Sequence, residues 1–130
     1  MVRIKREIYN QLVDWAKSEK PCEAAGYLFV DNTIFKKIIT TDKSVGHFFD
    51  HDTENLLRLI TKFSYPTAVF HSHPCAAIPS GTDRYYMQTT IPFFGCIWLI
   101  MSDRMRLRAW TLIGIDTDSM IFSEKEVEIV

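Results

Sequence analysis

Two histidines separated by one residue give the first indication of chemistry. His71 and His73 directly follow residues 67–70, a short segment rich in β-forming residues. Side chains alternate along a strand, so both imidazoles are expected on one face, where a single metal ion can bind both. Asp83 follows in the predicted first turn of a helix, where the helix dipole favours a carboxylate. Two imidazoles and one carboxylate leave a tetrahedral zinc one open position for water, which is typical of catalytic sites.

Glu23 is the second unusual residue. It stands in the segment PCEAAGYLF, between small and apolar neighbours, where an ionised carboxylate is costly unless it has a partner. A nearby metal ion and its water would be such a partner. As a general base, Glu23 would take a proton from the water and give it to a leaving amine. The alternative is a structural role at the exposed edge of a strand or in a first helical turn.

The elements that position these residues can be predicted from periodicity. A helix that ends at Pro21 is expected to bury one stripe, formed by Ile8, Leu12, Trp15 and Ala16. Two strands over 24–30 and 34–42, joined at Asp31 and Asn32, predict a hairpin. A second amphipathic helix is expected over 52–63, with Asp52 or Thr53 as its N-cap.

The second half of the chain is predicted to supply the site and more of the sheet. Ser80 or Thr82 can cap a short helix that reaches about Gln88. Further strands are expected over 93–101 and 107–115, and the tail 124–130 can add another. Six or seven strands with two or three interspersed helices predict a single α/β domain over 1–130, a mixed sheet flanked by helices.

Composition narrows the class of protein. The chain has 130 residues, 47% of them hydrophobic and 24% charged, which fits one globular domain and disfavours disorder or a second core. The net charge of -1 is spread without blocks, so neither a nucleic-acid nor a membrane partner is indicated. The longest apolar run, 93–101, is half the length of a membrane span, and the N-terminus has no secretory pattern, so a cytoplasmic location is expected.

The remaining cysteine, histidine and tryptophan residues are given structural roles. Cys22, Cys75 and Cys96 are an odd number without C-x-x-C spacing, which favours reduced thiols over a disulfide framework. Cys75 is interpreted as a small loop residue, and Cys22 and Cys96 as buried. No metal role is assigned to the two further histidines, His47 and His51. The tryptophans Trp98 and Trp110 lie in strand patterns and are expected in the core.

Together these residues carry a family resemblance. Glu23, then His71-Ser-His-Pro74, then Ser80-Gly-Thr-Asp83 resemble the JAMM motif of the JAB1/MPN/Mov34 metalloprotease family. The order of the predicted elements agrees over most of the chain. The resemblance implies a mixed α/β sheet similar to the cytidine deaminase architecture. It also implies one zinc ion with a bound water, held by His71, His73 and Asp83, with Glu23 as acid and base and Ser80 stabilising the oxyanion.

One departure concerns the loop between the histidines and Ser80. The six residues PCAAIP separate His73 from Ser80, where the family pattern has seven. A loop can absorb this difference, so His71, His73 and Asp83 remain the expected ligands. The shorter loop affects how far the Ser80 side chain can reach toward the oxyanion.

The resemblance implies zinc-dependent hydrolysis of a peptide or isopeptide bond. The expected substrate is an extended peptide, such as the C-terminal tail of a ubiquitin-like or sulfur-carrier protein, and short loops make the chain similar to minimal prokaryotic members. The alternatives are a phage-tail or cell-wall peptide hydrolase of the same family, and a non-catalytic MPN-type interaction module. Deaminase chemistry is disfavoured because H-x-E and P-C-x-x-C are missing from the sequence. The oligomeric state is left open.

Overall fold

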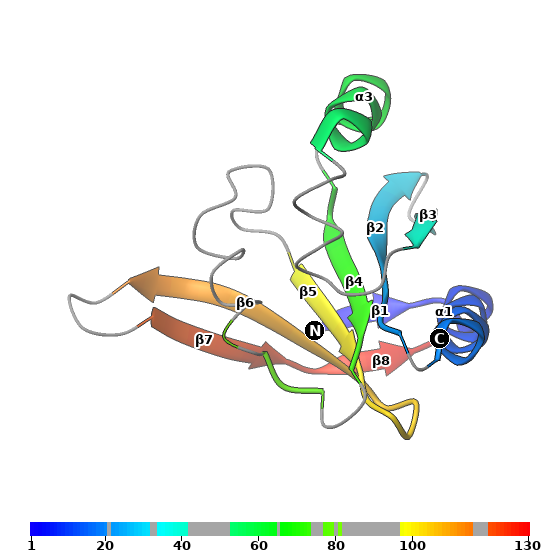
Figure 1. Ribbon diagram of the computed structural model, residues 1–130. Coiled ribbons are helices and arrows are strands. Elements are labelled where there is room, and N and C mark those ends of the chain that lie inside the picture. The colour runs from blue at the N-terminus through cyan, green and yellow to red at the C-terminus, as the bar shows by residue number, and fades with distance from the viewer. Residues whose placement is uncertain are drawn as a thin grey trace.

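A six-stranded mixed sheet forms the centre of the molecule (Figure 1), as seen in a computed structural model that describes residues 1–20, 22–31, 34–41, 53–64, 66–73, 77–79, 81, 97–115 and 120–130. The strand order is β3-β2-β4-β5-β6-β7. The strands are β2 (Ala24–Asp31), β3 (Ile34–Thr41), β4 (Ala68–Ser72), β5 (Ile97–Met101), β6 (Leu107–Ile115) and β7 (Met120–Lys125). The β4–β5 pair is parallel and the other pairs are antiparallel.

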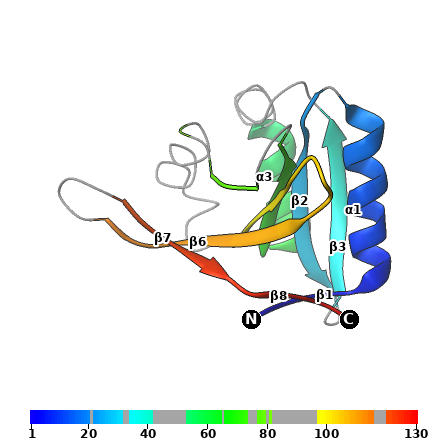
Figure 2. The same cartoon turned by 90° about the horizontal axis from the view of Figure 1, so that it is seen from below.

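A second, two-stranded sheet joins the two ends of the described chain. Strand β1 (Val2–Ile4) pairs in parallel with β8 (Val127–Ile129), and Figure 2 shows the pair below the large sheet. These strands raise the number of described strands to eight, so the expectation of six or seven was too low. A three-residue strand carries too little alternation to be recognised from its own sequence.

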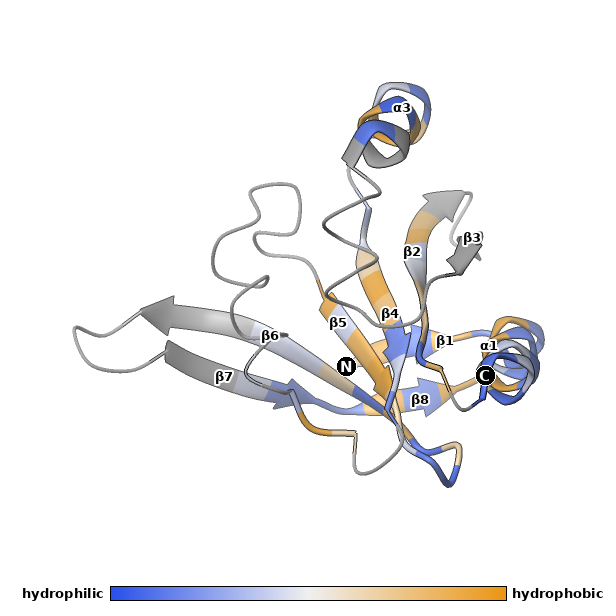
Figure 3. Cartoon of the chain, in the orientation of Figure 1, coloured by the Kyte–Doolittle hydropathy of each residue, from blue (hydrophilic) through white to orange (hydrophobic). Residues whose placement is uncertain are grey.

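Two helices lie on opposite faces of the large sheet. Helix α1 (Arg6–Glu19) packs Trp15 against Phe70 of β4, with ring centroids 5.5 Å apart. Helix α3 (Thr53–Phe63) packs Phe63 against Phe29 of β2, also at 5.5 Å. In Figure 3 the hydrophobic residues concentrate on β4 and β5, whereas both helices carry hydrophobic and hydrophilic residues. This arrangement confirms the predicted sheet flanked by helices.

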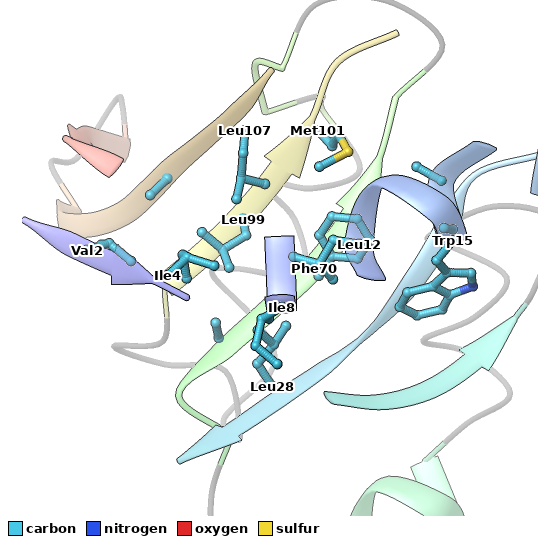
Figure 4. Close-up of a cluster of buried hydrophobic side chains, with 14 residues drawn as sticks. Val2, Ile4, Ile8, Leu12, Trp15, Leu28, Phe70, Leu99, Met101 and Leu107 are labelled. Atoms are coloured by element: carbon cyan, nitrogen blue, oxygen red, sulfur yellow. The ribbon is translucent and has the colours of Figure 1, made fainter. Parts of the chain in front are cut away.

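Helix α1 covers the main hydrophobic core (Figure 4). Its four buried residues are the ones that the periodicity predicts: Ile8, Leu12, Trp15 and Ala16. They meet alternate residues of the sheet, including Leu28, Phe70 and Leu99, each fully buried. The helix ends before Cys22, whose backbone N–H donates to the Glu19 carbonyl at 2.7 Å. Neither of the helices described here is long and apolar enough to cross a membrane.

Several predicted elements agree with the structure, and others cannot be compared with it. The hairpin is observed as β2 and β3, and 107–115 is observed as β6. The tail 124–130 contains the end of β7 and all of β8. The short helix from Ser80 to Gln88, the N-cap at Asp52 and the residues 93–96 lie outside the described residues, apart from Gly81.

Candidate metal centre

The two histidines lie where β4 ends, in the middle of the large sheet. His71 pairs with Ala25 of β2 on one side and with Ile100 of β5 on the other. His73 follows the strand, and its backbone N–H donates to the Met101 carbonyl at 2.8 Å. Both neighbouring strands therefore fix the backbone that carries the imidazoles, and both residues are buried, with 0% and 8% of their surfaces exposed.

The imidazoles converge on one face, as the alternation predicts. Their Nε2 atoms lie 2.9 Å apart, and their ring planes are inclined by 57°. Two nitrogens bound to one tetrahedral zinc lie about 3.3 Å apart, given Zn–N distances of about 2.0 Å. Without a cation, the same approach is a hydrogen bond in which one ring donates and the other accepts. The distance therefore suits a shared metal ion after a small outward movement of the rings.

Glu23 completes the cluster. It precedes β2, and one of its carboxylate oxygens lies within 4.8 Å of a ring nitrogen of both His71 and His73. The residue as a whole is half-buried, but its Oε2 atom is covered and has no hydrogen-bond partner among the residues that the structure describes. A buried carboxylate oxygen without a donor is costly. A cation and its water at the imidazoles would compensate this cost, so the donor set fits a metal such as zinc.

Aromatic residues support the histidines from the sheet. Trp98 of β5 is fully buried and meets the His71 ring edge to face, with centroids 5.7 Å apart and planes at 82°. Trp110 of β6 pairs with Trp98, and its Nε1–H donates to the Ala77 carbonyl at 3.0 Å. Trp110 therefore fastens part of the segment between His73 and Ser80 to the sheet. Trp110 itself is only half-buried. The prediction that both tryptophans lie in the core was therefore correct for Trp98 and wrong for Trp110.

An ion pair joins β6, the strand of Trp110, to β7. The Arg108 guanidinium lies 4.9 Å from the Trp110 ring centroid and donates two hydrogen bonds to Glu124, at 2.6 and 2.7 Å. These hydrogen bonds lower the pKa of the Glu124 carboxyl and raise the pKa of Arg108, against a smaller opposing effect of burial. The ion pair therefore holds the Arg108 guanidinium over the Trp110 ring.

The structure brings together three of the five predicted site residues. Glu23, His71 and His73 converge, whereas Ser80 and Asp83 lie outside the described residues. The role of each of the five residues stays a prediction. Cys22 is a free thiol, but it is half-buried rather than buried. Cys75, Cys96, His47 and His51 also lie outside the described residues.

The hydrogen bonds of Ser72 and Trp110 were not predicted from the sequence. The Ser72 hydroxyl accepts a hydrogen bond from the Ala24 backbone N–H at 2.9 Å, directly after Glu23. The signal was its position between two histidines on a strand, which places its side chain on the opposite face. The partner could not be inferred, because it depends on which strand lies beside β4.

Comparison with known proteins decides the family. Residues 5–113 match the family model of prokaryotic homologs of the JAB domain. The chain belongs to this JAB-domain family. The match spans α1, the Glu23 segment, both histidines and the first part of β6. No curated protein sequence matches the chain.

Solved structures agree with a JAB fold. The solution structure of protein DSY2949 from Desulfitobacterium hafniense has a TM-score of 0.67 at 18% identity, covering 100% of this chain and 93% of that one. A structure described as a metalloprotease-like zinc site, JAMM, in the proteasome and signalosome has a TM-score of 0.56 at 18% identity, covering 100% and 98%. A protein from Salinibacter ruber has a TM-score of 0.54 at 20% identity, covering 100% and 92%.

Proposed function

We propose that this JAB-domain protein is a zinc-dependent hydrolase of peptide or isopeptide bonds. The observation that carries the proposal is the convergence of the Glu23 carboxylate with His71 and His73 within 4.8 Å, on the central strands of the sheet. Two imidazoles beside a carboxylate whose Oε2 atom has no donor among the described residues are suited to a metal ion with a neighbouring general base. The family match and the zinc site named for one structural neighbour support the same choice.

His71, His73 and Asp83 would hold the ion. When bound, zinc is a Lewis acid that polarises the substrate carbonyl and lowers the pKa of water. Glu23 carries the proton: it accepts one as the water oxygen bonds to the carbonyl carbon, and it gives that proton to the amine nitrogen as the C–N bond breaks. The products are a carboxylic acid and an amine. The Ser80 hydroxyl would donate a hydrogen bond to the carbonyl oxygen as negative charge develops there.

We further propose that the substrate is the C-terminal tail of a ubiquitin-like or sulfur-carrier protein. Such a tail is extended, and an extended peptide can add to the edge of a sheet through backbone hydrogen bonds. Strands β3 and β7 are the edges of the large sheet in the described part of the chain. A phage-tail or cell-wall peptide is the second substrate class to be tested, since the chemistry at the carbonyl would be the same.

A cleavage screen tests the proposal. Reporter fusions placed after ubiquitin-like or sulfur-carrier tails form one panel, and phage-tail and cell-wall peptides form the other. The zinc-loaded protein is expected to cleave one panel, to lose activity with a chelator and to regain it with zinc. At a saturating zinc concentration the Glu23→Gln variant should still hold the ion and cleave roughly 100-fold more slowly, because it cannot accept the proton.

The matched control is Glu126→Gln, which makes the same substitution at an exposed site after β7 and should leave cleavage unchanged. Zinc-loaded protein that cleaves neither panel would contradict the hydrolase proposal and favour a non-catalytic interaction module. Full activity of Glu23→Gln would contradict the role of Glu23 alone.

A further inference from the structure

The contact between Ser72 and Ala24 joins the strand of the histidines to the segment that carries Glu23. The Ser72 hydroxyl accepts the Ala24 backbone N–H at 2.9 Å, and both residues are buried. The β2–β4 ladder runs from Leu28 paired with Ala68 to Ala25 paired with His71. The Ser72 side chain therefore extends the connection between these strands one residue beyond the last backbone pair, toward Glu23.

This hydrogen bond acts on the peptide group next to Glu23. The Ala24 N–H and the Glu23 carbonyl belong to one planar peptide unit, so fixing the N–H also fixes the orientation of that unit. The unit begins at the Cα atom of Glu23. A displacement of about 1 Å in a reacting group can cost about 100-fold in rate, so a restraint this close to the carboxylate has a direct effect on its placement.

The Ser72 side chain is held rigidly from its own strand. Ser72 pairs with Met101 of β5, and the alternation along β4 places its side chain on the face covered by α1, opposite to the face of His71. Ser72 thus lies between the two histidines in the sequence, and its hydroxyl holds the peptide unit that follows Glu23. Within the described residues, the Ser72 hydroxyl is the side-chain acceptor of the Ala24 backbone N–H.

We propose that Ser72 is a positioning residue that holds the Glu23 carboxylate over the two imidazoles. The inference rests on the proposed role of Glu23, but it concerns Ser72, which has no part in the proposed function. Ser72 is not one of the three ligand-type residues of the cluster, and it acts through the Glu23–Ala24 peptide unit. Loss of the Ser72 hydroxyl should weaken the coupling between Glu23 and a bound cation, while the two histidines stay at the end of β4.

The test uses a pair of variants of nearly equal shape. Ser72→Thr keeps the hydroxyl, and Ser72→Val replaces it with a methyl group. Both add one heavy atom, for which there is room because Ser72 lines a cavity of about 470 Å³ together with Ala16, Lys20, Cys22, His73 and Ser102. Ser72→Ala, which adds nothing, is the second hydroxyl-free variant in case Ser72→Val folds poorly by circular dichroism.

The first readout is zinc affinity, measured by competition with a chromophoric chelator. A carboxylate beside a cation raises its affinity, so Glu23→Gln should weaken zinc binding by about ten-fold. In the Ser72→Val or Ser72→Ala background the same substitution should weaken it by less than about two-fold, and Ser72→Thr should restore the full effect. Equal effects of Glu23→Gln in all backgrounds would overturn the proposal.

The second readout is amide hydrogen exchange at Ala24, which should become at least about ten-fold faster in Ser72→Val and return toward the original rate in Ser72→Thr. Unchanged exchange would also overturn the proposal. Where cleavage is measurable, kcat should fall in Ser72→Val with little change in KM. If no variant cleaves any substrate but the zinc coupling behaves as described, the hydrolase proposal fails and the positioning role of Ser72 stands.

Discussion

Zinc should stabilise the folded protein strongly, because the imidazoles of His71 and His73 reach their 2.9 Å separation only on β4, held between β2 and β5. A ligand that binds only the folded state at about 100 times its Kd raises the free energy of unfolding by about 2.7 kcal/mol. For a chain of 130 residues, an unfolding entropy of about 2.1 cal/mol/K per residue amounts to about 0.27 kcal/mol/K. Zinc is therefore expected to raise Tm by about 10 °C.

Differential scanning calorimetry with excess chelator and then with excess zinc measures this shift. His73→Ala should lose most of it, and because each variant is compared with itself, any direct effect of truncating a buried ring cancels. Glu126→Gln, an exposed substitution after β7, should keep the full shift. An unmodified protein with the same Tm in zinc and in chelator would show that zinc does not bind the folded state, and an undiminished shift in His73→Ala would show that His73 is not a ligand.

Two further predictions concern the supports of the site. Trp110→Phe keeps a smaller aromatic ring but removes the donor to the Ala77 carbonyl, and chemical denaturation should show a loss of at least about 1 kcal/mol; no loss would show that this hydrogen bond is not stabilising. Glu124→Gln weakens a half-exposed ion pair and should cost about 0.5 kcal/mol at pH 7. Arg108 lowers the pKa of Glu124, so this contribution is present at neutral pH and should disappear as the pH falls below about 4.3; a difference between the two proteins that persists in stronger acid would contradict the assignment.

The local features of the fold could be predicted because each depends on a short stretch of sequence. The stripe of Ile8, Leu12, Trp15 and Ala16 determines which face of α1 is buried, and the alternation along β4 brings the two imidazoles to one side. Neither result requires knowledge of which elements are neighbours.

The contacts between distant segments could not be predicted. Ala24 and Ser72 are 48 residues apart, and their hydrogen bond exists because β4 lies beside β2. The pairing of β1 with β8 likewise depends on where the two ends of the described chain meet, and three residues in each strand give almost no pattern. Trp110 was predicted in the core because its strand is apolar. Its strand, β6, is the second from the edge of the large sheet, and only β7 lies beyond it.

The arrangement explains how a small domain can build a site for charged chemistry inside an apolar sheet. Buried polar groups are tolerated when they have partners. Ser72 supplies an acceptor to the Ala24 N–H, and Trp98 supports the His71 ring. The Oε2 atom of Glu23 is a buried polar atom for which the described residues supply no hydrogen bond, and it belongs to the cluster with His71 and His73 that forms the proposed metal position.

The most direct test is a crystal structure of the zinc-loaded protein with anomalous diffraction recorded at the zinc edge. We expect one anomalous peak at about 2.0 to 2.1 Å from the Nε2 atoms of both His71 and His73, with a carboxylate oxygen of Asp83 as a further ligand. A peak that contacts neither imidazole, or no peak in a protein saturated with zinc, would contradict it.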